Sequence, residues 1–171
     1  MNVFRRETGL ELSEIDPFLA ELLRQIPESA NTDDAPAAKA RLFSAPVDES
    51  EQDFREEWKQ YVQPELAQLF RSSGETVAAD LKQLCGKERT FANRTLRIPN
   101  EHADAWLNAL NQARLAIAAR NDFTEGELGD CYRSPIGSRR DLSLFQVNFY
   151  GFLQEVILRE LSGCGDNGAD Q

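Results

Sequence analysis

The chain has 171 residues, 41% of them hydrophobic and 28% charged, and its formal net charge at pH 7 is −10. These values are typical of one globular domain that buries a sizeable core without disulfides or metals. The acidic balance disfavours binding to DNA, RNA or anionic lipid, because such binding depends on clustered Lys and Arg. No apolar run approaches the roughly 20 residues of a membrane span. We therefore expect neither a nucleic-acid partner nor a membrane partner.

Cysteine and histidine usage points to the cytoplasm and away from metal chemistry. Cys85, Cys131 and Cys164 are far apart and odd in number, which fits reduced thiols better than a disulfide framework. His102 is the only histidine, so Cys and His cannot supply the closely spaced ligands of a zinc site. We expect a cytoplasmic protein with no metal and no cofactor, and we expect His102 on the surface.

The N-terminal part of the chain predicts a β-hairpin followed by a helix. Residues 2–12 read as two short extended pieces around a turn that contains Gly9. Ser13 then resembles a helix cap, and apolar residues recur at helical spacing up to Pro27. We predict a helix over residues 14–26.

Residues 28–49 break this periodicity. Their Ala, Asp, Ser and Pro content leaves little to bury, which predicts a flexible acidic linker inside the domain. Leu42 and Phe43 are the exception, and we expect them to pin the middle of the linker to the core. The stretch 33–57 holds eight acidic residues against three basic ones. We interpret it as a solvated acidic face rather than a partner site.

The middle of the chain predicts a long helix and then a strand. The apolar spacing favours a helix over residues 51–85 that is interrupted at Pro64, since proline has no backbone N–H to donate. Residues 90–98 favour an extended conformation and could add a strand to the N-terminal hairpin.

Two more helices, over residues 100–120 and 141–161, complete the pattern, with an irregular connection between them. The tail, residues 163–171, is expected to be disordered. The predicted fold class is mainly α, with a helical bundle and a small sheet of two or three strands. A single domain should cover residues 1–162.

The last helix is apolar on two neighbouring faces. One stripe contains Phe145, Phe149, Phe152 and Val156, and the other contains Tyr150, Leu153, Ile157 and Leu161. A surface helix of a monomer needs only one stripe of this width. Either the other helices cover both stripes, or one stripe faces a partner chain in a homodimer.

Arg114 is a candidate buried charge, because it shares a helix face with apolar residues. A charge in that position needs a partner. We predict a pair with Glu155 of the last helix, with Gln154 as the other candidate. Such a pair would fix the register of the two helices, or it would belong to a polar binding pocket between them.

Ser138, Arg139 and Arg140 directly precede the predicted last helix. Cations at a helix N-terminus oppose the helix dipole. Their placement could therefore mark a site for an anion or an acidic partner. The alternative is a loop pair neutralised by a nearby carboxylate such as Glu125 or Glu127.

Three segments carry a resemblance to a known family: FREEWKQYVQPELAQLF, LRIPNEHADAWLNALNQARLAIAAR and FLQEVILREL. They resemble a bacterial family of uncharacterised proteins classed as a domain of unknown function. In actinobacteria, members of that family are often encoded beside the Clp protease adaptor. The resemblance covers most of residues 1–162, and it implies a role near regulated proteolysis but no catalytic residue.

No motif in the sequence indicates catalytic, cofactor-binding or metal-binding residues. The glycines lack the strand-to-helix context of a phosphate-binding loop. We therefore expect a non-enzymatic protein-interaction or regulatory protein with a protein partner. An anion- or ligand-sensing regulator that uses Arg139 and Arg140 is the alternative, and a transcriptional regulator is disfavoured by the acidic charge.

Overall fold

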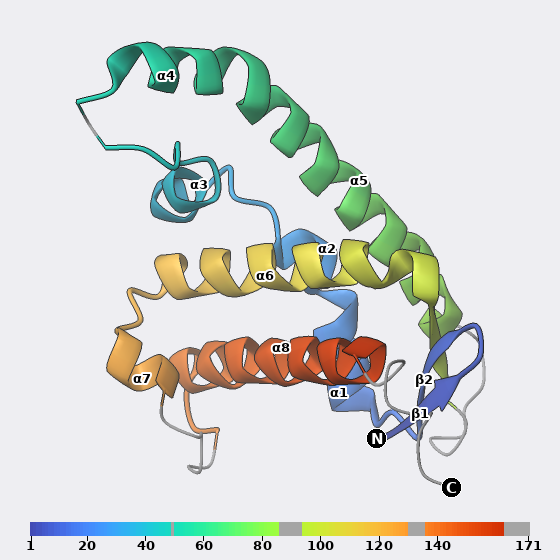
Figure 1. Ribbon diagram of the computed structural model, residues 1–171. Coiled ribbons are helices and arrows are strands. Elements are labelled where there is room, and N and C mark those ends of the chain that lie inside the picture. The colour runs from blue at the N-terminus through green and yellow to red at the C-terminus, as the bar shows by residue number, and fades with distance from the viewer. Residues whose placement is uncertain (49, 86–93, 130–135, 163–171) are drawn as a thin grey trace, which may run out of the picture.

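The computed structural model describes residues 1–48, 50–85, 94–129 and 136–162, and it is mainly α with a small sheet at one end (Figure 1). In chain order the elements are β1 (Asn2–Arg6), β2 (Gly9–Ser13), α1 (Pro17–Arg24), α2 (Ile26–Ser29), α3 (Pro36–Leu42), α4 (Gln52–Glu57), the π-helix η1 (Trp58–Val62), α5 (Gln63–Leu81), the 3-10 helix η2 (Lys82–Cys85), β3 (Leu96–Pro99), the 3-10 helix η4 (Asn100–His102), α6 (Ala103–Arg120), α7 (Glu125–Gly129) and α8 (Arg139–Ser162). The predicted fold class is confirmed.

The sheet is antiparallel, with β2 between β1 and β3. Leu10 pairs with Ile98, and Leu12 pairs with Leu96. All four side chains are buried, because alternate residues of each strand face the helices. Gly9 passes so close to β3 that an added Cβ would lie 2.1 Å from the Ile98 carbonyl oxygen. The predicted hairpin and its third strand are both present.

Helices α6 and α8 form the centre of the molecule, lying side by side and antiparallel (Figure 1). Trp106 of α6 and Tyr150 of α8 are fully buried between the surrounding elements. The Tyr150 hydroxyl donates to the Leu22 carbonyl oxygen at 2.7 Å and accepts from Gln146 Nε2 at 2.7 Å. This pairing satisfies the one polar group that the ring carries into the core.

Helix α1 begins later than the sequence pattern predicted. The cap is Asp16 rather than Ser13, and its carboxylate accepts a hydrogen bond from the Leu19 backbone N–H at 3.0 Å. Pro17 fills the first helical position, where its missing N–H is not needed. Pro27 lies inside α2, so the chain turns between α1 and α2 instead of leaving the helical region there.

The predicted interruption at Pro64 takes the form of a widened turn. The Gln63 backbone N–H bonds to the Trp58 carbonyl oxygen, five residues back, in the π-helix η1. Proline cannot donate to residue i−4, and its ring clashes with that carbonyl in an ordinary α-helix. The wider turn relieves both problems and lets α4, η1 and α5 run on as one rod. Residues 52–70 of this rod rise away from α6 and α8 (Figure 1), and we call them the arm.

The interpretation of residues 28–49 as a bare linker is wrong, because α3 forms inside it and packs on α6. Ala35 and Ala38 are buried there against Ala116. Alanine contributes a small apolar face that hydrophobic periodicity does not detect, yet it is the best helix former. Contact with α6 supplies the remaining stability.

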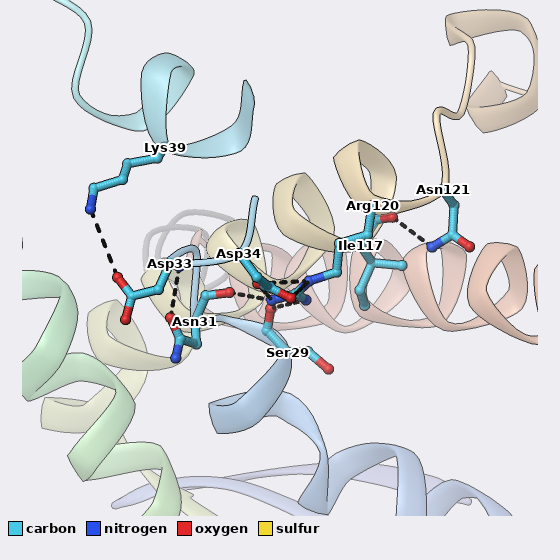
Figure 2. A network of polar contacts seen from close by, with 8 residues as sticks. All are labelled: Ser29, Asn31, Asp33, Asp34, Lys39, Ile117, Arg120 and Asn121. Atoms are coloured by element: carbon cyan, nitrogen blue, oxygen red, sulfur yellow. Dashed lines mark hydrogen bonds and ion pairs between the residues drawn. The ribbon is translucent and has the colours of Figure 1, made fainter. Parts of the chain in front are cut away.

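Arg120, at the end of α6, fixes the chain that leads into α3 (Figure 2). Its guanidinium donates to the carbonyl oxygens of Ser29 and Asn31 and to both carboxylate oxygens of Asp34, with the shortest contact to Asp34 at 2.6 Å. This bond to Arg120 lowers the pKa of the Asp34 carboxyl. The start of α3 is thereby held against the core.

Several expectations lie outside the described residues. They include the disordered tail and the thiols of Cys131 and Cys164.

Among the described helices, none is both long and apolar enough to cross a bilayer.

Candidate functional site

A groove of about 980 Å³ runs between the arm and the segment that contains α3. Ala40, Phe43 and Val47 line one wall, and Trp58, Pro64 and Ala67 line the arm side. This volume is at the upper end of the range for ligand pockets, and the apolar side chains are typical of such sites. We call it the arm groove.

Phe43 holds the two walls of the arm groove together. Its carbonyl oxygen accepts hydrogen bonds from Trp58 Nε1 at 3.2 Å and from Gln63 Nε2 at 2.9 Å. Its ring packs edge-on against Phe70, with 5.5 Å between the ring centroids. We predicted that Leu42 and Phe43 pin this segment to the core; Phe43 instead fixes it to the arm.

The arm also exposes large apolar side chains. Phe54, Tyr61 and Leu69 are 41%, 62% and 47% exposed. Phe54 stacks on Trp58, with 6.4 Å between the ring centroids. Aromatic residues are enriched at the cores of protein interfaces. Exposed apolar side chains on an arm that also lines an apolar groove are typical of a surface that has a partner.

The charged side chains around the arm groove are mostly basic. Among the described residues, Lys39, Arg55 and Lys59 line it together with a single carboxylate, Glu56. Lys39 lies 3.8 Å from Asp33, whereas neither Arg55 nor Lys59 has an ion pair within the described part of the chain. The local balance is thus opposite in sign to the net charge of −10.

Ser138, Arg139 and Arg140 belong to the start of α8, which begins two residues earlier than predicted. Ser138 caps the helix, since its hydroxyl accepts from the Asp141 backbone N–H at 3.1 Å. Hydrogen bonds from Ser138 and from the Gly137 backbone N–H lower the pKa of the Asp141 carboxyl. The Asp141 carboxylate and the Ser138 cap compensate for the cations in the first turn.

Arg140 is already neutralised by a carboxylate, as the alternative interpretation stated. Its guanidinium lies 2.7 Å from Glu127, donates to the Asn121 carbonyl oxygen and covers the Phe123 ring at 4.6 Å. Hydrogen bonds from Thr124 and Arg140 lower the pKa of Glu127 to about 2. Arg139 is exposed. Arg140 therefore joins α7 to α8, whereas Ser138 caps α8 and Arg139 is open to solvent.

The predicted pair between Arg114 and Glu155 is wrong, because Glu155 is exposed to solvent. Arg114 Nη1 donates to Gln154 Oε1 at 2.6 Å, and Gln154 Nε2 donates to the Leu107 carbonyl oxygen at 3.2 Å. Successive side chains of an α-helix point in directions 100° apart, so Gln154 faces Arg114 and Glu155 does not. The guanidinium also covers Gly151, where an added Cβ would lie 3.2 Å from Arg114 Cζ.

A buried carboxylate that the sequence did not single out lies between α5 and α6. Asp80 accepts a hydrogen bond from Trp106 Nε1 at 2.9 Å and lies 3.0 Å from His102 Nδ1. His102 is therefore half-buried and paired, not a free surface residue as predicted. The spacing of His102 and Trp106, one helical turn apart, is the only signal that could have linked them. The cluster joins two helices and is satisfied internally.

The two apolar stripes of α8 differ in how far they are buried. Tyr150, Leu153 and Ile157 are buried, so their stripe is core; the side chain of Leu161 lies outside the described part. In the other stripe Phe149 and Val156 are buried, but Phe152 is 48% exposed. Phe145 is half-buried against Phe18 of α1. Phe152 thus remains as an exposed apolar side chain on α8.

Taken together, the fold and the site define a mainly helical protein with a small antiparallel sheet and an apolar groove beneath a projecting arm. A family of proteins classed as a domain of unknown function, DUF2017, matches residues 3–161. The chain belongs to this family. Comparison with curated proteins and with solved structures gave no match.

Proposed function

We propose that this chain is a non-enzymatic protein-interaction or regulatory protein that binds another protein in the arm groove. The observation that carries the proposal is the groove itself, with Phe43 and Trp58 in its walls. Phe54 and Tyr61 are exposed on the same arm but do not line the groove. Trp and Tyr are the residues most often found at the energetic centres of interfaces. The groove could accept the apolar face of a helix or an extended segment.

The position of the arm supports this proposal. The core of α6, α8 and the sheet is closed by residues of α5 beyond the arm, such as Val77 and Leu81. The exposed aromatic residues of residues 52–70 therefore contribute little to that core. Large apolar groups at the surface lower solubility unless a partner covers them. Their presence on the arm therefore supports a protein partner.

A link to regulated proteolysis is the finer form of the proposal, and its support is the family resemblance given above. An anion-sensing role receives less support, because Arg140 is engaged by Glu127 and Asn121. The groove is the better candidate for any regulatory contact.

The test fills the groove without removing an existing contact. Ala40 lies on α3, is exposed and lines the groove, whereas Ala37 on the same helix is exposed but does not line it. We expect Ala40→Phe to lose the proteins that the wild-type chain captures from a lysate of its source organism, and Ala37→Phe to keep them. Quantitative mass spectrometry of both captures measures this. Equal capture by the two variants would show that the partner binds elsewhere.

A further inference from the structure

Arg55 and Lys59 lie four residues apart on the arm, so they project from consecutive turns toward the same side. Lys39 stands on the opposite wall. Cations therefore flank the apolar centre of the arm groove from both sides, although Lys39 already lies 3.8 Å from Asp33. Among the lining residues that the structure describes, only Glu56 is acidic. In a chain with 29 acidic and 19 basic residues, this reversal is a local feature of the groove.

We propose that the arm groove selects an acidic partner segment: a protein segment with one or two bulky apolar side chains flanked by Asp or Glu. The apolar side chains would enter between Phe43 and Trp58, and the carboxylates would face Arg55 and Lys59. This inference rests on the proposed function and adds the chemistry of the partner.

Charge complementarity is the argument for this occupant. The apolar walls provide affinity but little discrimination, while charges at the rim of an interface set specificity and association rate. A basic partner segment would place like charges against Arg55 and Lys59 and leave them unpaired. An acidic segment pairs both.

The net charge of the whole chain does not prevent such binding. Charges more than about 8 Å away are largely screened at physiological ionic strength, whereas Arg55, Lys59 and Lys39 would contact the segment directly. We therefore expect affinity to fall moderately, not steeply, with added salt. A nucleic-acid strand, whose affinity depends on many phosphate contacts, fits a groove with three cations and one carboxylate less well.

The experiment selects peptides from a random 16-residue display library on the full-length wild-type chain, keeping those that Ala40→Phe fails to bind. Their affinities are then measured by the change in Trp58 fluorescence, with Trp58→Phe as the blank because buried Trp106 also emits. We expect the selected peptides to be rich in Asp, Glu and large apolar residues.

The decisive comparison is between two double variants with the same change in net charge. Arg55→Glu with Lys59→Glu reverses the charge of the groove, and Arg71→Glu with Lys82→Glu reverses two exposed positions outside it, on α5 and η2. We expect the first to weaken the selected peptides at least tenfold and to select basic peptides when the library is applied again. The second should leave their affinity within twofold.

Each other outcome overturns a defined part of the inference. Groove-binding peptides without acidic enrichment would remove the charge preference and leave the proposed function standing. A library that yields no peptide sensitive to Ala40→Phe would defeat both. If the wild-type chain self-associates with concentration and the groove double variant does not, the occupant is a second copy of the chain. If an RNA oligomer binds more tightly than any peptide, the occupant is a nucleic acid.

Discussion

The α6–α8 core and the arm show how differently one chain can use the same kinds of residue. Each contains one of the two tryptophans. Trp106 is fully buried, and its hydrogen bond to Asp80 joins α6 to α5. Trp58 is half-buried, donates to a single carbonyl and lines an open groove. The comparison teaches that apolar residues of this protein divide into those that fold it and those that are available to a partner.

The largest expected effect separates the two tryptophans. Trp106→Ala should destabilise the protein by about 3–5 kcal/mol, because it leaves a large cavity and removes a hydrogen bond to the buried Asp80 carboxylate. Trp58→Ala should destabilise the protein by about 1 kcal/mol, mainly through the loss of its hydrogen bond to the Phe43 carbonyl and of its stacking on Phe54. Urea unfolding of both variants measures the difference. Equal losses would mean that the arm is part of the folding core.

The stability of the core should also depend on pH. Burial raises the pKa of Tyr150 from its ordinary value of 10.0 to about 12. The folded state holds this proton more tightly, so the contribution is present below pH 10 and is lost as pH rises from 10 to 12. Its size is roughly 2–3 kcal/mol.

Tyr150→Phe is the control for this titration. The variant should be less stable at pH 7, because Gln146 and the Leu22 carbonyl lose a partner, but its stability should fall less between pH 10 and 12 than that of the wild type. Denaturant unfolding at each pH gives the comparison. Equal losses of stability between pH 10 and 12 in the two proteins would show that folding does not raise the pKa of Tyr150.

A smaller effect distinguishes the two predicted partners of Arg114. Arg114→Ala should cost about 1–2 kcal/mol, because it removes a partly buried hydrogen bond to Gln154 and the packing over Gly151. Glu155→Ala, at an exposed position, should change stability by less than about 0.5 kcal/mol. Thermal unfolding of both variants tests this, and a double-mutant cycle between Arg114 and Glu155 should show no coupling.

The smallest effects are two glycine substitutions of opposite sign. Gly74→Ala should stabilise the protein by up to about 1 kcal/mol, since an added Cβ meets nothing within 4 Å and alanine is the better helix former. Gly151→Ala should destabilise by about 1 kcal/mol, because the guanidinium of Arg114 is held by Gln154 and cannot easily withdraw. Melting temperatures that shift in the same direction would contradict this view of the α6–α8 contact.

The sequence by itself determined the elements whose signals are local. Apolar periodicity predicts the helices over residues 100–120 and 141–161, the hairpin, and the strand within residues 90–98. These signals do not depend on distant residues. The change of helix geometry before Pro64 follows from the missing N–H and the ring clash of proline. These properties belong to a residue and its near neighbours.

Tertiary structure decided the rest. Helix α3 forms because Ala35 and Ala38 meet Ala116, far away in the sequence. Whether Gln154 or Glu155 faces Arg114 depends on the rotation of α8 relative to α6. The apolar pattern of the sequence does not fix this rotation to within one residue. The arm groove brings Phe43 beside Trp58 and Gln63, and no local pattern encodes that meeting. Contacts between distant segments arise only when the chain has packed.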